Sequence, residues 1–291
     1  MSILKTFKID VCQRDLNFIY KKVSEYPWHE MPSDGGWQFG ANIDFMKDLC
    51  KYWVEQFDWK RQEDKINSFD NFTAEVDGIE VHFIYERGSG SKPKPLIISH
   101  GWPGSIIEFI EIIDPLAHPE RYGGNAEDAF DVIVPSLVGF GFSGKPPRPY
   151  GPRRMALIFN KLMTEVLGYK SYIAQGGDWG GTISTWLGYD YPKFCDGIHI
   201  NIMTVRHYEG PKGVEEELWA STFEEDQIPE NGYRILQATK PQTLSYGMMD
   251  SPVGIAAWIL EKMHAWSDLN NNKIESVYSK DKLLANIMVY V

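Results

Sequence analysis

The 291-residue sequence predicts an α/β fold: a mostly parallel sheet with an antiparallel edge and helical additions at both ends. Three observations support this prediction. Two apolar runs, at residues 72–76 and 79–85, flank Asp77-Gly78, a strong signal for a two-residue hairpin. Short apolar runs then alternate with helix-length segments as far as residues 198–203. No β-rich run follows, so helices are expected in the rest of the chain.

Each predicted element has its own local signal. Apolar residues recur at helical spacing over residues 15–24 and 42–57, which predicts an N-terminal helical segment of residues 1–70. Residues 71–207 would form the sheet core, and residues 208–291 a helical cap. Short apolar runs predict buried strands at residues 96–99, 130–134, 172–174 and 198–203. The predicted cap helices are residues 231–238, 252–266 and 280–290.

Composition and charge are those of an ordinary globular protein. Hydrophobic residues make up 43% of the chain, and 29 basic against 40 acidic residues give a net charge of -11. This balance argues against nucleic acid or an anionic membrane surface as the partner. No run approaches the roughly 18 apolar residues of a membrane span, and residues 1–10 lack the apolar core of a signal peptide. We therefore expect a cytoplasmic protein without a membrane anchor.

The most informative stretch is GGDWG at residues 176–180. Glycines on both sides of Asp178 permit a sharp turn from the preceding strand into a helix. This is the geometry of a nucleophile elbow, with Asp178 where esterases carry serine. The dipole of the following helix favours the ionised carboxylate, which could attack carbon and form a covalent ester. The other interpretation is an aspartate that only caps the helix of an ordinary βα turn.

A second motif, HGWPGS at residues 100–105, follows a predicted strand. An α/β-hydrolase holds the oxyanion with one backbone N–H after the nucleophile and one from this loop. Here the donors would be Trp102 and Trp179. The loop itself would be shaped by His100, Gly101 and Pro103. A plain βα turn with a proline at the start of the helix would look similar, but two motifs in the right order favour function.

Together these motifs resemble the microsomal-type epoxide hydrolases, including the juvenile-hormone epoxide hydrolases. Further blocks are similar to the family: FTAEVDGIEVHFI at residues 72–84, GFGFS at 139–143, QATKPQT at 237–243 and DSPVG at 250–254. The resemblance covers nearly the whole chain. It implies an α/β-hydrolase fold with an N-terminal helical segment and a helical cap.

The resemblance also implies a mechanism. Asp178 would attack a ring carbon of a small apolar epoxide and form a hydroxyalkyl ester. Cap tyrosines of the family protonate the ring oxygen, and Tyr233 falls at the first of their two positions, although a tyrosine packed in the cap core is the alternative. A histidine oriented by a carboxylate would then activate the water that hydrolyses the ester.

Here the sequence departs from the family pattern. The second cap tyrosine, the orienting acid, the base histidine and the last sheet strands would lie beyond Val291. The seven histidines offer no substitute. His100 belongs to the oxyanion loop, and His199 to a strand expected to be buried. Of the others, His118 and His207 are in loops, and no carboxylate stands at a persuasive spacing from His29, His82 or His264. We therefore assign no base and expect a C-terminally truncated enzyme. A second polypeptide would carry the missing residues, or the chain alone would not complete turnover.

Two other functions stay open at this point. A haloalkane dehalogenase also uses an aspartate followed by tryptophan, and a catalytically inactive binding protein would need no base. Cofactor and metal sites are not predicted. GFGFSG at residues 139–144 fits a dinucleotide fingerprint, but prolines follow where a helix must begin. Residues 268–279 lack the glycine and glutamate of a calcium loop, and no His/Cys cluster has metal-ligand spacing.

Overall fold

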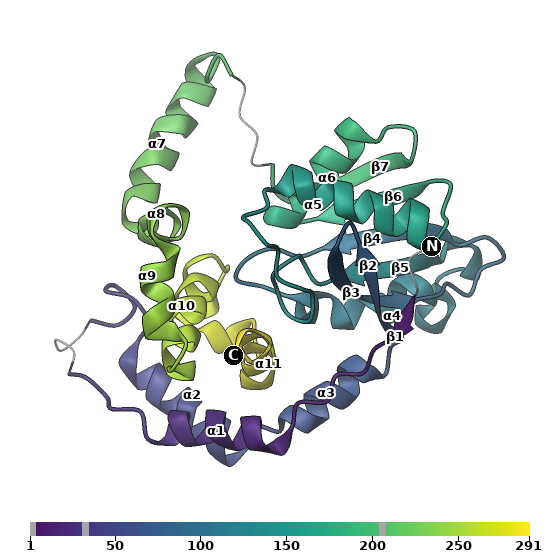
Figure 1. Cartoon of the computed structure of the whole chain (residues 1–291). Helices are drawn as coiled ribbons and strands as arrows, with labels where there is room; N and C mark the ends of the chain where they lie inside the picture. Colours follow the sequence, from purple (N-terminus) through teal and green to yellow (C-terminus); the bar gives the residue numbers. More distant parts are fainter. Residues whose placement is uncertain (1–3, 31–34, 204–207) are drawn as a thin grey trace.

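The chain folds as an α/β protein, in a computed structural model that describes residues 4–30, 35–203 and 208–291 (Figure 1). Its strands are β1 (Lys5–Thr6), β2 (Asn71–Val76), β3 (Ile79–Glu86), β4 (Lys94–Ser99), β5 (Phe130–Pro135), β6 (Tyr172–Gly176) and β7 (Cys195–Ile200). Its α-helices are α1 (Gln13–Ser24), α2 (Ile43–Glu55), α3 (Trp59–Asn67), α4 (Ile110–Ala117), α5 (Pro152–Lys161), α6 (Trp179–Asp190), α7 (Val214–Glu230), α8 (Gly232–Thr239), α9 (Pro241–Met248), α10 (Pro252–Ala265) and α11 (Lys280–Tyr290). The 3-10 turns are η1 (Ile106–Phe109), η2 (Pro119–Tyr122), η3 (Ala126–Asp128), η5 (Asn270–Asn272) and η6 (Ile274–Ser276), and η4 (Leu162–Val166) is a π-helical turn.

The strands form one seven-stranded sheet in the order β1-β2-β3-β5-β4-β6-β7. The strands β5, β4, β6 and β7 are parallel neighbours, whereas β1, β2 and β3 pair antiparallel. The predicted parallel sheet with an antiparallel edge is therefore confirmed, and the edge has three strands. Ser99 at the end of β4 pairs in register with Gly176 at the end of β6. The segments that follow these two strands consequently start side by side.

The predicted hairpin joins β2 to β3. Asp77 and Gly78 both have positive φ, 55° and 79°, as a two-residue turn matched to the twist of the strands requires. The Asp77 carboxylate also accepts a hydrogen bond from Lys161 Nζ at 2.9 Å, which ties the turn to α5. The turn chemistry read from the sequence thus sets the antiparallel edge.

The last strand differs from its prediction. The expected buried strand at residues 198–203 is β7, Cys195–Ile200, which pairs with β6 at the opposite edge of the sheet. Ile198 is 43% exposed, Ile202 beyond the strand is 48% exposed, and the His199 side chain is also exposed. The expectation of burial was wrong because an apolar run does not reveal whether another strand covers it.

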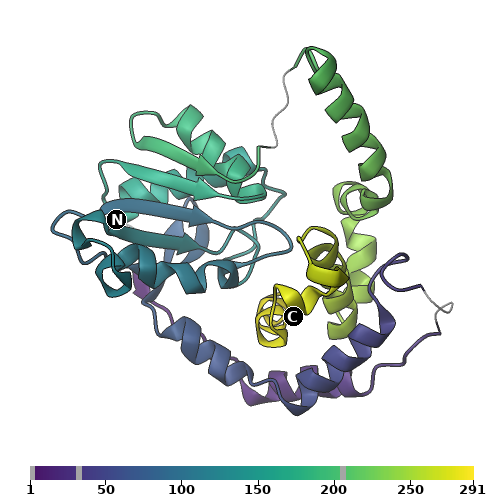
Figure 2. The same ribbon diagram turned by 180° about the vertical axis from the view of Figure 1, so that it is seen from behind.

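The N-terminal helices connect the sheet to α8–α10, the helices predicted to form a cap. In Figures 1 and 2, α1–α3 extend from the sheet towards α8–α10, and α11 lies within this arc. Helix α1 packs on α2 and α10, and α11 packs on α2 and α3. One apolar core includes Leu49 and Trp53 of α2, Ile84 of β3 and Ile287 of α11. None of the helices described is both long enough and apolar enough to cross a membrane.

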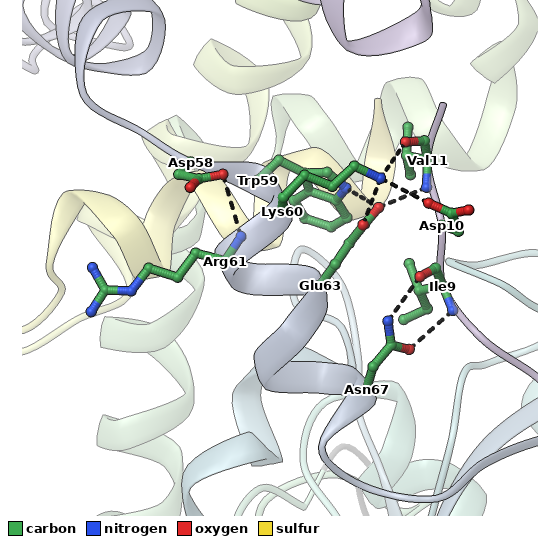
Figure 3. Close-up of polar contacts among 9 residues, drawn as sticks. All are labelled: Ile9, Asp10, Val11, Asp58, Trp59, Lys60, Arg61, Glu63 and Asn67. Carbon is green, nitrogen blue, oxygen red and sulfur yellow. Dashed lines mark hydrogen bonds and ion pairs between the residues drawn. The ribbon is translucent and has the colours of Figure 1, made fainter. Parts of the chain in front are cut away.

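A group of polar contacts fixes residues 9–11 onto α3 (Figure 3). The buried Glu63 carboxylate accepts hydrogen bonds from the Val11 N–H and from Trp59 Nε1, both at 2.7 Å. It is also paired with Lys60 Nζ at 2.9 Å, so its charge is compensated. The side chain of Asn67 bonds both the N–H and the carbonyl of Ile9, at 3.0 and 2.8 Å. The segment before α1 is therefore held against the helix that leads into β2.

Candidate functional site

Asp178 lies on the sharp turn between β6 and α6. Its φ of 50° and ψ of −124° are unusual for a residue with a side chain, and such strain is typical of a functional turn. A Cβ added to Gly176 would lie 2.1 Å from the carbonyl carbon of Gly180. A Cβ added to Gly180 would lie 1.8 Å from the carbonyl oxygen of Ser99. The two glycines are thus required by backbone contacts within the turn and between the turn and β4.

The loop after β4 lies against the Asp178 carboxylate. The Trp102 N–H donates a hydrogen bond to Asp178 Oδ1 at 2.8 Å, and the Trp179 N–H also bonds this carboxylate. A Cβ added to Gly101 would lie 2.2 Å from Asp178 Oδ1, so only glycine allows this approach. The structure therefore brings together the predicted nucleophile and the two predicted oxyanion donors.

The electrostatics of Asp178 combine two opposing effects. Burial raises the pKa of the carboxyl above its ordinary value, and the N–H groups of Trp179 and Trp102 lower it. We expected the helix N-terminus to favour the ionised form, and its N–H does so. The pKa of Asp178 is nevertheless raised overall, because the effect of burial is larger than that of the two N–H groups. A carboxylate that is partly stripped of water is a better nucleophile than a fully hydrated one.

His100 holds the loop from beneath. Its Nε2 accepts a hydrogen bond from the Leu137 N–H at 3.1 Å, which leaves Nδ1 to donate to the Gly101 carbonyl at 3.0 Å. Burial lowers the pKa of the ring to about 4. His100 is therefore a neutral side chain with both ring nitrogens in use, and it links the loop to the end of β5. It is not available as a base.

Helix α11 supports the same loop from the other side. Asn286 donates to the Pro103 carbonyl at 2.8 Å and accepts from the Ser105 hydroxyl at 2.7 Å. The Tyr290 hydroxyl donates to the Gly104 carbonyl at 2.6 Å. Sequence reasoning missed Asn286 and Tyr290, because a helix-length apolar segment gives no local sign of which loop it will contact.

Tyr233 of α8 lies above the loop. Its ring stacks on Trp102 with 5.0 Å between centroids and 9° between planes, and the edge of Trp266 packs on it at 5.1 Å. Burial, and then the Asp178 carboxylate, raise the pKa of the phenol. Tyr233 is therefore a neutral phenol within the influence of the Asp178 charge, and its role as a proton donor stays a prediction.

A cavity of about 290 Å³ opens beside Asp178. Apolar and aromatic side chains dominate part of its wall, among them Trp102, Met263 and Trp266. Polar groups also face it, including Lys262 and Asn201. A larger cavity of about 360 Å³ between α3, α4 and α11 contains none of the predicted site residues. The smaller cavity is thus the candidate active site.

Glu108 also lines the cavity, and sequence reasoning missed it. Burial, followed by the charge of Asp178, raises the pKa of this carboxyl to about 7. The pattern Ser105-x-x-Glu108 is a helix-capping signal that could have drawn attention to it.

No histidine among the described residues of the site is available as a base. His100 is the one histidine among the described residues that line the cavity. The rings of His82 and His118 are engaged elsewhere, the first by Ser136 and Asn71 and the second by Glu86. His207 lies outside the described residues. Within the described ranges, no group of three or more His, Cys, Asp or Glu is placed to hold a metal ion.

Comparison with known proteins places this geometry in context. The family model "Epoxide hydrolase N terminus" matches residues 4–109, and "alpha/beta hydrolase fold" matches residues 94–203. Epoxide hydrolase 1 of Oryctolagus cuniculus is 33% identical over 315 residues, a match covering 99% of this chain and 69% of that protein. A Stigmatella aurantiaca protein, named an epoxide hydrolase only provisionally, is 39% identical over 288 residues, covering 98% of this chain and 65% of the relative.

Solved structures of epoxide hydrolases are also similar to this chain. The juvenile hormone epoxide hydrolase of the silkworm Bombyx mori superposes with a TM-score of 0.90 at 28% identity, covering 100% of this chain and 74% of that one. The predicted α/β-hydrolase fold is thereby confirmed. The chain spans between 65% and 69% of the length of the two curated relatives described above.

Proposed function

Because the chain belongs to the epoxide hydrolase family, we propose that it opens an epoxide to a vicinal diol through an ester on Asp178. The observation that carries this proposal is the Asp178 carboxylate, held by the Trp102 N–H at 2.8 Å on a strained turn beside a cavity. The partly apolar wall of that cavity fits an apolar epoxide. The matched family favours an epoxide over the haloalkane considered above.

The first step forms the ester. One oxygen of Asp178 attacks a ring carbon, the bond between that carbon and the ring oxygen breaks, and the ring oxygen takes the Tyr233 hydroxyl proton. Tyr233 suits this role because burial and the Asp178 charge keep its phenol protonated until an alkoxide develops. The stacking on Trp102 places Tyr233 against the residue whose N–H binds the Asp178 carboxylate.

The second step hydrolyses the ester. Water attacks the carbonyl carbon of Asp178, and the N–H groups of Trp102 and Trp179 stabilise the oxyanion. The family resemblance assigns proton removal to a histidine with an orienting acid. We propose that both, with the second cap tyrosine, belong to a further segment or to a second polypeptide. The exposed apolar side chains around β7, such as Ile198, support a partner at that edge.

The test is the mass of the protein after a brief reaction with styrene oxide and an acid quench. We expect a gain of one epoxide mass, mapped to the peptide that contains Asp178. Asp178→Asn should form no adduct, whereas Asp196→Asn on the exposed face of β7 should behave like the parent. An adduct elsewhere, or none within any quench time and no diol, would refute the proposed function.

A further inference from the structure

Two carboxylates share the loop between β4 and η1. Asp178 Oδ1 occupies the space where a Gly101 side chain would begin, 2.2 Å from an added Cβ. Glu108 Oε1 occupies the corresponding space at Gly104, 1.5 Å from an added Cβ. Both carboxylates line the same cavity. Glycine at both positions is therefore what allows two acidic groups to approach one oxyanion loop.

A purely structural role for Glu108 has to be weighed first. Ser105 caps η1 by accepting a hydrogen bond from the Ile107 N–H at 3.2 Å, and Glu108 bonds back to the Ser105 N–H. This is the arrangement of a capping box. The hydrogen bond that caps η1 uses only one acceptor position of Glu108, whereas a carboxylate has about four. Most of the carboxyl group is surrounded by protein atoms, but part of the Glu108 residue is exposed where it lines the cavity.

The charged groups around Glu108 leave it poised between two protonation states. Asp178 faces it from the start of α6 and, together with burial, raises its pKa. Lys282 of α11 lowers that pKa only weakly, since its Nζ is bound to Glu111 at 3.1 Å. From the same helix, Tyr290 directs its hydroxyl to the Gly104 carbonyl, and Lys262 of α10 faces the cavity. The result is a pKa of about 7, where a general base is most effective.

We propose that Glu108 binds the water that hydrolyses the Asp178 ester and accepts its proton. The inference rests on the proposed function and adds a residue within this chain to its second step. A histidine supplied from elsewhere would act beside Glu108. The capping bond uses part of the acceptor capacity of the carboxylate, and Glu108 lines the same cavity as Asp178.

The proton balance closes with the residues already named. Glu108 takes a proton as the water oxygen bonds to the carbonyl carbon of Asp178. When the tetrahedral intermediate collapses, the bond from that carbon to the diol oxygen breaks, and Glu108 returns the proton to the leaving oxygen. The Asp178 carboxylic acid then protonates the Tyr233 phenolate left by the first step. No other co-reactant is needed.

Single-turnover reactions of the full chain with styrene oxide separate the two steps. Glu108→Gln keeps an acceptor for the capping bond but cannot take the proton. We expect ester formation within about twofold of the parent and ester decay slowed by about 100-fold, the usual size of a lost general base. Glu75→Gln is the matched control, because Glu75 is exposed on β2 and is not among the residues lining this cavity.

The outcomes distinguish the two proposals. Equal ester decay in the parent and Glu108→Gln overturns the role of Glu108 and leaves the ester mechanism intact. Absence of both an Asp178 adduct and diol in the parent overturns the proposed function itself. If Glu108→Gln does not fold, the parent decides alone. Its ester decay must accelerate as pH rises through about 7, and a pH-independent decay overturns the inference.

Discussion

The backbone around Asp178 and the helices α8 and α9 differ in how far their residues are buried. Around the elbow, Ser99 and His100 are almost completely buried, and a Cβ on Gly180 would collide with β4. In α8 and α9, by contrast, no residue is buried, and Ile235 is 58% exposed. The candidate nucleophile is thus part of the packed sheet, whereas the candidate proton donor is carried by an element with few buried contacts.

This difference has a chemical reason. Nucleophile and oxyanion donors must be placed to within about half an ångström, which only a rigid, well-packed frame provides. The proposed reaction requires an epoxide to reach Asp178, and helices with few buried residues are easier to displace than the packed sheet. The contacts of α8 include the stacking of Tyr233 on Trp102 and a hydrogen bond from Trp258 Nε1 to the Gln237 side chain at 2.9 Å.

The largest effect is expected where the elbow touches β4. Gly180→Ala places a methyl group 1.8 Å from the carbonyl oxygen of Ser99, and backbone atoms cannot yield as a side chain end can. We expect a loss of about 3 kcal/mol or more in the free energy of unfolding, or no folded protein. Urea unfolding followed by circular dichroism measures it. A variant as stable as the parent would show that the elbow is not rigid.

We expect acid to lower the free energy of unfolding through protonation of His100. Burial lowers its pKa from 6.5 to about 4, so the unfolded chain binds a proton more readily than the folded one between these values. The stability from the neutral ring is complete above pH 6.5 and is lost as pH falls towards 4, by about 3 kcal/mol at most. His100→Asn should flatten the fall of unfolding free energy measured from pH 7 to 4. An unchanged slope would contradict this account.

Glu108 contributes with the opposite sign over a similar range. Its folded pKa of about 7 lies above the ordinary value of 4.5, so its contribution weakens as pH rises between these values. The change in unfolding free energy with pH must therefore be measured for each variant and compared with that of the parent.

In the cap, the expected effect is on the rate. Tyr233→Phe removes the hydroxyl but keeps the ring that stacks on Trp102. We expect ester formation to slow by about 100-fold, with little change in stability, because only the proton donor is lost. Tyr246→Phe in α9, at a side chain that is 79% exposed, is the control. Stopped-flow or quenched-flow alkylation measures both, and equal rates would remove Tyr233 from the mechanism.

The smallest expected effect is a gain of stability in α9. Gly247 lies inside α9 and has no atom within 4 Å of an added Cβ. Gly247→Ala should therefore stabilise the protein by about 0.5–1 kcal/mol through helix propensity. The same substitution thus has opposite signs at Gly180 and at Gly247. Destabilisation at Gly247 would mean that the cap helices are packed more tightly than their exposure indicates.

Local signals predicted the parts of the site that depend on backbone shape. The glycines around Asp178 and in the loop after β4 are required by close approach, and such requirements are visible as glycine in the sequence. The hairpin at Asp77-Gly78 was predictable for the same reason. The exposure of β7 was not, because neighbours in a sheet are chosen by the whole chain.

Residues adjacent along the chain determined the sharp turn at Asp178, the glycine-rich loop after β4 and the hairpin, and they also carry the family resemblance. The tertiary structure alone decided which side chains meet at the loop. Ser105 bonds Asn286 across 181 positions, and Tyr290 reaches Gly104 across 186. It also placed Glu108 beside Asp178 and gave it a pKa of about 7. Burial and the field of a neighbouring charge are properties of packed space, and they have no counterpart in the spacing of residues along a chain.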